Sequence, residues 1–348
     1  MKIVIATVKV PFVHGGAELH AEGLRSALCA EGHEVAIVAL PFKWYPPERI
    51  LDQILAYRLL DVTESAGVPV DRLIGLKFPA YFIPHPHKVL WILHQHRPAY
   101  DLWETANGDL LHYPHGAHIR HMIQQADRSL LPEAKAIFTN SANVSQRLKL
   151  YCGIHARPLY HPPPHAEHFY ASAAEDYFFF PSRLQPLKRQ ALVLQALSHT
   201  RQPVRVCFAG MADYPGYEHE LRVLAQKYKV RHRVEWLGHV TEVEKRALYA
   251  HAVGVVFPPL DEDYGYVTLE AMLACKVVIT CTDSGGPLEF VRARETGFIV
   301  DPTPAALAHA MDEIWQDRAR AKCMGEAGLA HYHRLGITWS KVVQRLLS

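Results

Sequence analysis

Apolar runs and helical patterns alternate along the chain from its first residues. Residues 2–8 (KIVIATV) form an apolar run that predicts a strand, and a helical pattern follows at residues 17–32. Apolar residues recur in that pattern at steps of three and four, the spacing of one helix face: Ala17, Ala21, Leu24 and Leu28. The run VAIVAL at residues 35–40 is continuous, which is typical of a strand buried on both faces of a parallel sheet.

The same alternation continues to the end of the chain, with one interruption. Further strands are predicted at residues 72–77, 88–94 and 136–140. The segment at 161–169 (HPPPHAEHF) holds consecutive prolines, which break any helix or strand, and the alternation restarts after it. Because strands that alternate with helices form parallel sheets, we expect two α/β halves. Ligands of such sheets bind at the carboxyl ends of the strands, here in a cleft between the halves.

The length supports this division, since 348 residues exceed what one core commonly organises. We expect an N-terminal domain at residues 1–165 and a C-terminal domain at residues 166–330. The remaining segment, 331–348, contains a helical pattern near 339–347 that we expect to pack back towards the N-terminal domain.

Composition narrows the class of protein. The net charge of +2 is too small for a nucleic-acid footprint, so we expect no nucleic-acid partner. The six cysteines are scattered, with neither a C-x-x-C pair nor metal-ligand spacing, as in a reducing cytosol. No apolar run reaches the roughly 20 residues of a membrane span, and MKIVIATVKV lacks the apolar segment of a signal peptide. The sequence therefore predicts a cytoplasmic protein.

Glycine-containing loops that lead into helices are the first candidates for chemistry. In HGGAE, which begins at His14, Gly15 and Gly16 would let the backbone approach a phosphate, and the N–H groups of the following helix suit an anion. A plain connection between a strand and a helix explains this loop equally well. It also lacks the G-x-G-x-x-G pattern of dinucleotide binders, which disfavours an oxidoreductase.

Two further loops carry charged side chains. In PSRLQPLKRQ, Arg183 and Lys188 lie at the expected start of a helix, where cations are unfavourable unless an anion such as a diphosphate lies between them. The alternative is a pair of solvated surface cations. In FPPLDEDYGYVTLEAM, Glu262 and Glu270 flank Gly265. Carboxylates only accept hydrogen bonds and suit the hydroxyls of a sugar, although Glu270 is also consistent with an ordinary helix start.

These motifs, taken in order, resemble the retaining glycosyltransferases of family 4, which have the GT-B fold of two Rossmann-like domains. The resemblance rests on E-x7-E, R-x4-K, the early Gly-Gly-Ala-Glu, and GGPLEFV with TGFIV, and is strongest from about residue 177 to 302. It implies transfer of a hexose-like sugar from a nucleoside-diphosphate sugar to an acceptor hydroxyl, in glycan or glycoconjugate synthesis. It also implies that no metal or other cofactor is needed, because Lys188 and Arg183 would take a cation's role.

The resemblance implies a role for each candidate residue. Glu270 would hold the ribose, Glu262 the donor sugar, and Arg183 and Lys188 the diphosphate. His94, at a strand end, would face the donor sugar, so the catalytic candidates are His94, Glu262, Arg183 and Lys188. The remaining donor-binding candidates lie in glycine turns or beside them: Gly15, Gly16, Gly210, Gly238, His239, Val240, Gly265, Tyr266 and Val267. The acceptor-side candidates are Glu18, His96 and Arg97, of which the last two also compete with His94 for its place.

Because this sequence departs from the family pattern at several positions, it does not identify the nucleotide sugar that serves as donor. The usual Glu-Gly-Phe-Gly is Glu-Asp-Tyr-Gly here, Arg189 replaces a usual glycine, and Gly210 is followed by Met-Ala-Asp. A nucleotide-sugar 2-epimerase on the same fold and a non-catalytic sugar-nucleotide-binding subunit remain alternatives. We expect the acceptor to be a glycan, a lipid-linked molecule or a small molecule.

Residues 43–60 have a pattern that is also found in helices that bind a membrane surface. Ile50, Ile54 and Leu55 form an apolar stripe with aromatic and basic residues before it. Such a helix would rest on the inner face of an anionic membrane and give access to a lipid-linked acceptor. The alternative, which we favour, is a helix that packs on the N-terminal sheet.

Overall fold

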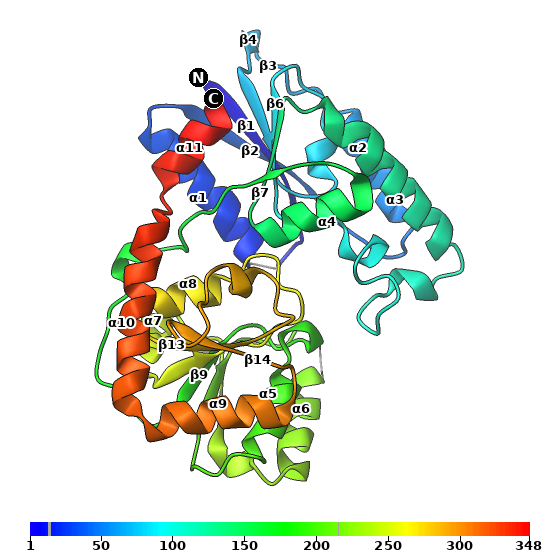
Figure 1. Ribbon diagram of the computed structural model, residues 1–348. Helices are drawn as coiled ribbons and strands as arrows, with labels where there is room; N and C mark the ends of the chain where they lie inside the picture. The colour runs from blue at the N-terminus through cyan, green and yellow to red at the C-terminus, as the bar shows by residue number, and fades with distance from the viewer. Residues whose placement is uncertain (13–14, 215) are drawn as a thin grey trace. The chain divides into compact units, whose positions relative to one another are not determined.

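The computed structural model describes residues 1–12, 15–214 and 216–348, so His14 of the first glycine loop lies outside the described residues. The chain divides into two compact units (Figure 1). The N-terminal unit comprises Met1–Pro164 together with Thr338–Ser348, and the C-terminal unit comprises His165–Ile337. The expected division at residue 330 falls inside helix α10 (Arg318–Leu335), so the segment that returns to the N-terminal unit begins at Thr338 and not at 331.

The N-terminal unit is built on a parallel sheet. Its described strands follow the order β2-β1-β5-β6-β7-β8. Their bounds are β1 Lys2–Lys9, β2 Glu34–Pro41, β5 Arg72–Gly75, β6 Lys88–Ile92, β7 Ala136–Thr139 and β8 Arg157–Pro158. The small antiparallel pair β3 (Glu64–Ser65) and β4 (Val68–Pro69) lies outside this sheet.

Helices cover both faces of this sheet. On one face α1 (Gly16–Ala30) and α11 (Trp339–Leu347) share a core with β1 and β6. The two helices approach so closely that a Cβ on Gly23 would lie 2.5 Å from the Trp339 ring. The other face is covered by α2 (Arg49–Arg58), α3 (Gly116–Leu130) and α4 (Ala142–Cys152).

Helix α2 packs on its own unit through part of the stripe seen in the sequence. Ile50 is buried and Ile54 is partly buried against the same core, which agrees with the packing alternative for these two residues. Leu55 differs, because 59% of it is exposed. The described helices include none with the length and apolar character of a membrane span.

The C-terminal unit repeats the plan with a second parallel sheet. Its described strands follow the order β11-β10-β9-β12-β13-β14. Their bounds are β9 Phe178–Pro181, β10 Val206–Ala209, β11 Val234–Gly238, β12 Gly254–Val256, β13 Val277–Cys281 and β14 Gly297–Val300. The central strands are buried over their whole length, as expected for strands covered on both faces.

Two groups of helices surround this sheet. Helix α5 (Gln190–Leu197) contacts α6 (Tyr217–Lys227) and α9 (Pro304–Gln316). Helix α8 (Tyr266–Leu273) contacts α10, and it is joined to α7 (Glu242–His251) by side-chain hydrogen bonds. The loops at the carboxyl ends of β9 and β12 carry four of the residues singled out from the sequence: Arg183, Lys188, Glu262 and Gly265. Both halves are therefore α/β units with parallel sheets, as predicted.

Candidate functional site

The loop that carries Glu262 is joined by backbone hydrogen bonds to the loop after β13. The Glu262 N–H donates to the Ser284 carbonyl at 2.9 Å, and the Gly286 N–H donates to the Glu262 carbonyl at 2.8 Å. A Cβ on Gly286 would lie 2.5 Å from the carbonyl oxygen of Tyr264. Only glycine permits this approach, so the pair of glycines seen in the sequence holds the two loops together.

Lys188 reaches the Glu262 carboxylate from another loop. It ends the short 3-10 turn Pro186–Lys188 after β9, and its ammonium group donates to Glu262 Oε2. Both side chains are largely shielded, with 15% and 21% of their surfaces exposed. The Lys188 ammonium also lies 5.6 Å from the centre of the Phe257 ring. The structure thus brings together a cation and a carboxylate that are 74 residues apart in sequence.

Glu270 lies on α8 and is almost completely buried. Its carboxylate accepts hydrogen bonds from the Tyr249 hydroxyl at 2.7 Å and from the Lys245 ammonium at 3.1 Å, both on α7. Lys245 also pairs with Glu242 at 2.9 Å. Burial alone would lower the pKa of Lys245, but the carboxylates of Glu270 and Glu242 outweigh it and raise that pKa above its ordinary value.

The turn into α8 needs a glycine. Gly265 has a φ of 86°, in the left-handed region, and directly precedes the first residue of the helix, Tyr266. The first N–H groups of a helix have no acceptor within it, and they favour an anion. Burial raises the pKa of the Tyr266 hydroxyl, and the charge of Glu270 raises it further. The Tyr266 phenol therefore stays protonated. Val267, the next candidate, is buried in the core beneath.

The candidates near the strand ends β10 and β11 also come together. The Gly210 N–H donates to the Gly238 carbonyl at 2.8 Å. A Cβ on Gly210 would lie 2.1 Å from the Ser182 carbonyl oxygen, which explains a glycine at this position. His239 and Val240 follow Gly238 and lead into α7. Their place at the end of a strand is the one expected from the sequence.

Arg183 and Arg189 each have a carboxylate partner. Arg183 pairs with Asp213 at 2.8 Å, although 53% of its side chain is exposed. Arg189 makes two parallel bonds to Asp283, at 2.8 and 2.7 Å. Arg189 also has a φ of 60°, so the usual glycine at this position has a plain reason in the left-handed backbone.

The first glycine loop, at Gly15 and Gly16, leads directly into α1. The Gly15 N–H donates to the Glu18 carboxylate at 2.9 Å, and Gly16 is the first residue of the helix. Glu18, an acceptor-side candidate, therefore satisfies the N-terminus of its own helix in this structure. Gly15, Gly16 and Glu18 belong to the N-terminal unit, whereas Glu262 belongs to the C-terminal unit.

The loop after β6 holds the candidate histidines. His94 Nδ1 lies 2.7 Å from the Gln95 carbonyl oxygen, and because a carbonyl only accepts, Nδ1 carries the proton. The His96 ring packs 5.3 Å from that of Phe78, and burial, with a smaller effect of His94, lowers the pKa of His96 to about 3. Arg97 pairs with Asp101, Nε to carboxylate, at 2.7 Å.

The sequence reasoning missed residues that hold the candidates in place. Lys245 and Tyr249 hold Glu270, Asp213 holds Arg183, and Asp283 holds Arg189. The spacing of Lys245 and Tyr249, four positions apart on one helix face, offered a signal for the first two. Nothing comparable in the sequence joined Asp213 or Asp283 to a partner.

Metal-binding geometry occurs away from these residues. Across the described ranges, one group of three potential ligands lies close enough together to hold an ion: His165, Glu167 and His168. All three are exposed, and none belongs to the candidate site.

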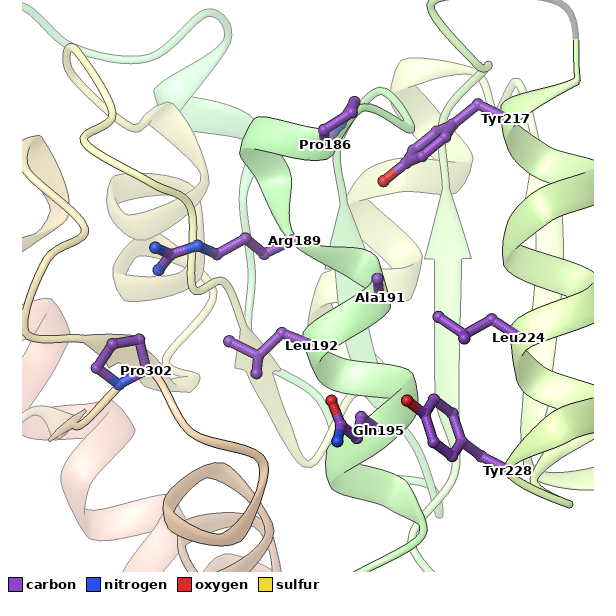
Figure 2. A pocket seen from close by; sticks show the side chains of 9 residues that line it. All are labelled: Pro186, Arg189, Ala191, Leu192, Gln195, Tyr217, Leu224, Tyr228 and Pro302. Atoms are coloured by element: carbon purple, nitrogen blue, oxygen red, sulfur yellow. The ribbon is translucent and has the colours of Figure 1, made fainter. Parts of the chain in front are cut away.

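A groove lies on the surface of the C-terminal unit between α5 and α6. It has a volume of about 440 Å³ (Figure 2). Leu224 on α6 and Tyr228 directly after it point towards α5, where Gln195 lies opposite Tyr228. Leu192 and Arg189 point to the other side, towards Pro302. Its lining includes neither Lys188, Glu262 nor Glu270.

Known proteins resemble the chain in sequence. Residues 169–331 match the model of the family described as glycosyl transferases group 1. The alpha-1,3/1,6-mannosyltransferase of Dictyostelium discoideum is 33% identical over 119 residues, 34% of this chain and 28% of that protein. The D-inositol 3-phosphate glycosyltransferase of Salinispora tropica is 29% identical over 178 residues, 48% of this chain and 36% of that protein. The chain thus matches well under half the length of these relatives.

Solved structures resemble the chain over its whole length. Sucrose-phosphate synthase from Thermosynechococcus elongatus superimposes with a TM-score of 0.78 at 18% identity, covering 99% of this chain and 97% of that one. HepE from Anabaena, solved in complex with UDP-glucose, gives 0.72 at 17% identity, covering 100% and 98%. These likenesses confirm the expected GT-B fold.

Proposed function

We propose that this chain, whose residues 169–331 match the model of the group 1 glycosyl transferases, moves a sugar from a nucleoside-diphosphate sugar to an acceptor hydroxyl with retention at the anomeric carbon. The observation that carries the proposal is the convergence in the C-terminal unit. Lys188 and Glu262 meet beside the Gly265 turn, and Glu270 lies a helix turn beyond it with its own donors.

Lys188 would change partner when the donor binds. Its ammonium group bonds Glu262 in this structure, and a diphosphate carries more negative charge than one carboxylate. Transfer of Lys188 to the phosphate would leave Glu262 to accept hydrogen bonds from hydroxyls of the donor sugar. As the bond to the leaving diphosphate breaks, the charge that grows there is stabilised by Lys188 and by the N–H groups at the start of α8.

Glu270 suits a ribose diol. A carboxylate offers about four lone-pair sites, and Tyr249 and Lys245 use one each. Two hydroxyl donors on neighbouring carbons fit what remains. Because burial and Glu270 itself hold the pKa of Tyr249 well above its ordinary value, Tyr249 stays a donor and keeps the carboxylate oriented.

The reaction would need no metal ion, because Lys188 and Arg183 supply positive charge for the diphosphate. Arg183 would have to leave Asp213 for this role, and its exposed side chain has the freedom to do so. The proposal is supported by the position of these cations.

The acceptor would reach the N-terminal unit from the cytoplasm or from the inner face of a membrane. The Lys43 ammonium group lies 5.0 Å from the centre of the Tyr45 ring. Exposed apolar side chains lie before α2, on it and directly after it: Trp44, Tyr45, Leu55 and Leu59. They support peripheral contact with an anionic bilayer. Sedimentation with phosphatidylglycerol vesicles should bring the protein down, and Leu55→Ser with Leu59→Ser should weaken that binding.

The test is turnover by the purified protein. Incubation with GDP-mannose, UDP-glucose, ADP-glucose or dTDP-glucose should release one nucleoside diphosphate, in the presence of EDTA as well as in its absence. Retention is read from the anomeric coupling constant of the product. Isomerisation of the donor at C2 would indicate the epimerase instead, and binding without turnover would indicate a non-catalytic subunit. Activity that EDTA abolishes and magnesium restores would contradict metal independence.

A further inference from the structure

A carboxylate lies fully buried in the N-terminal unit, behind the loop that carries His94. Asp127, on α3, is 0% exposed. Its carboxylate accepts hydrogen bonds from Tyr81 at 2.8 Å, from Tyr100 at 2.5 Å and from the side chain of Gln95. Burying a carboxylate is costly unless hydrogen bonds compensate it. A leucine at this buried position of the helix would cost less free energy. We therefore expect the aspartate to have a function.

The hydrogen bonds of Asp127 join segments that are separate in sequence. Tyr81 lies in the 3-10 turn Ala80–Phe82, Tyr100 directly follows the turn Arg97–Ala99, and Gln95 lies between β6 and that turn. Cys152, at the end of α4, adds a contact, since Gln95 Nε2 lies 3.0 Å from its sulfur. Both the amide and the carboxylate are therefore held by several elements.

Gln95 connects this cluster to His94. Its side chain is 4% exposed and is bonded to both Asp127 and Cys152. Its backbone carbonyl accepts the proton of His94 Nδ1 at 2.7 Å. With the side chain of Gln95 fixed, the carbonyl direction is fixed as well, and so is the proton on Nδ1. In the neutral ring of His94, Nε2 then carries the lone pair.

We propose that Asp127, Tyr81, Tyr100, Gln95 and Cys152 form a positioning cluster that sets the tautomer and the orientation of His94 for sugar transfer. The inference rests on the proposed function in that His94 acts on the donor sugar through Nε2. The cluster itself touches neither donor nor acceptor. Its effect passes through the Gln95 carbonyl, so it should be visible in the loop even without turnover.

Asp127→Asn tests the cluster with little change in shape. An amide offers one acceptor oxygen where the carboxylate offers two, and its NH₂ group faces groups that also donate. Gln95 should lose its anchor. We expect faster amide hydrogen exchange in residues 93–97, and turnover of GDP-mannose or UDP-glucose lowered by about tenfold. The KM for the donor should change less than about threefold, because the nucleotide contacts lie in the other unit.

A matched control and a milder variant accompany this change. Asp312 is a buried carboxylate of the C-terminal unit that accepts the N–H groups of Arg201 and Gln202, at 2.8 and 3.0 Å. Asp312→Asn should affect stability but neither the exchange of residues 93–97 nor turnover. If Asp127→Asn does not fold, Tyr100→Phe removes a single donor and should give the same changes at smaller size.

A double-mutant comparison separates this inference from the proposed function. If the cluster acts through His94, Asp127→Asn should lower turnover in the wild type but not further in His94→Ala. Equal losses in both backgrounds, or unchanged exchange in residues 93–97, would overturn the positioning role. If His94→Ala retains normal turnover, the role of His94 in the proposed function fails, whereas the exchange measurement still decides whether Asp127 orders the loop.

Discussion

At the scale of single residues, the candidate site consists of cations that each hold a carboxylate. Lys188 pairs with Glu262, and Lys245 pairs with Glu270. The pairs differ in burial, because Glu270 is 6% exposed at its side chain and Glu262 is 21% exposed. A buried pair that loses one partner leaves an uncompensated charge, whereas a more exposed pair can exchange partners.

This difference predicts distinct effects for the two glutamates. Glu270→Ala should weaken binding of free GDP or UDP by about tenfold or more, because hydrogen bonds to a charged group contribute about 1.5–3 kcal/mol. Glu262→Ala should abolish sugar transfer. It should leave nucleotide binding unchanged or tighter, because the Glu262 carboxylate no longer competes with the diphosphate for Lys188. Calorimetric titration and turnover measure the two quantities. Glu244→Ala, at an exposed cap of α7, is the control, and equal losses in both measurements would show that the roles are mis-assigned.

Arg189 allows a test of backbone strain at one residue. A left-handed φ costs a non-glycine residue about 1–2 kcal/mol, and the ion pair with Asp283 offsets that cost. Asp283→Ala should therefore destabilise the protein more than Arg189→Gly does. In the Asp283→Ala background, Arg189→Gly should raise the free energy of unfolding by about 1 kcal/mol. Urea unfolding measures both, and a second loss in the double variant would rule out the strain.

At the scale of elements, the central strands could be predicted because a strand buried on both faces is a continuous apolar run. The run at 35–40 also forms a strand, β2, but β2 lies at the edge of its sheet and is only partly buried. The helix at 339–347 also follows from its pattern and matches α11. The pairing of side chains could not be predicted in the same way. Asp213 and Asp283 meet their arginines only because separate loops converge at the strand ends, and no local pattern encodes that meeting. Residues 43–60 yielded a shorter helix, Arg49–Arg58, after Pro46 and Pro47.

The joined loops after β12 and β13 depend on one glycine. Gly286→Ala would place a Cβ 2.5 Å from the Tyr264 carbonyl oxygen, where backbone must move. We expect a lower melting temperature together with weaker binding of GDP or UDP, because the displaced loop carries the turn at Gly265 that positions the first N–H groups of α8. Overpacking of this kind costs about 1–3 kcal/mol.

The control for that substitution is Gly328→Ala on α10. Its Cβ would lie 3.4 Å from Met272, an ordinary contact, and alanine favours a helix interior by about 1 kcal/mol over glycine. It should leave the melting temperature unchanged or raised, with nucleotide binding intact. If Gly286→Ala behaved the same way, the close approach of the two loops would not matter to the site.

At the scale of the whole molecule, the two units differ in how many of their histidines have a pKa lowered by the surrounding protein. In the N-terminal unit, burial lowers the pKa of His20 and of His96 to about 3, and lowers that of His161 well below its usual value. The C-terminal unit contains His331, whose pKa is lowered by burial and then by Arg292 and Arg334. Among the described residues, most of these histidines with a lowered pKa therefore lie in the N-terminal unit.

We therefore predict that the N-terminal unit unfolds first as the pH falls. An unfolded chain binds a proton at each histidine near pH 6.5, and the folded form does not, so stability is present above pH 6.5 and is lost towards pH 3. Each histidine contributes about 1.4 kcal/mol per pH unit. Asp127 acts in the opposite sense below about pH 6, because burial raises its pKa to about 6 and the folded form then binds the extra proton.

Tryptophan fluorescence reports mainly on this unit, because four of the six tryptophans lie in it, at positions 44, 91, 103 and 339. The His20 ring lies 4.1 Å from Trp91 and 6.5 Å from Trp339. Urea unfolding followed at pH 7.5, 6.5 and 5.5 should show that the free energy of unfolding decreases as the pH is lowered. His20→Gln removes one titrating ring and should flatten the slope by about 1.4 kcal/mol per pH unit, whatever it does to stability at neutral pH. His118→Gln, on the exposed side of α3, should leave the slope unchanged. A wild-type slope near zero between pH 6.5 and 5.5 would mean that these histidines accept protons within the folded unit.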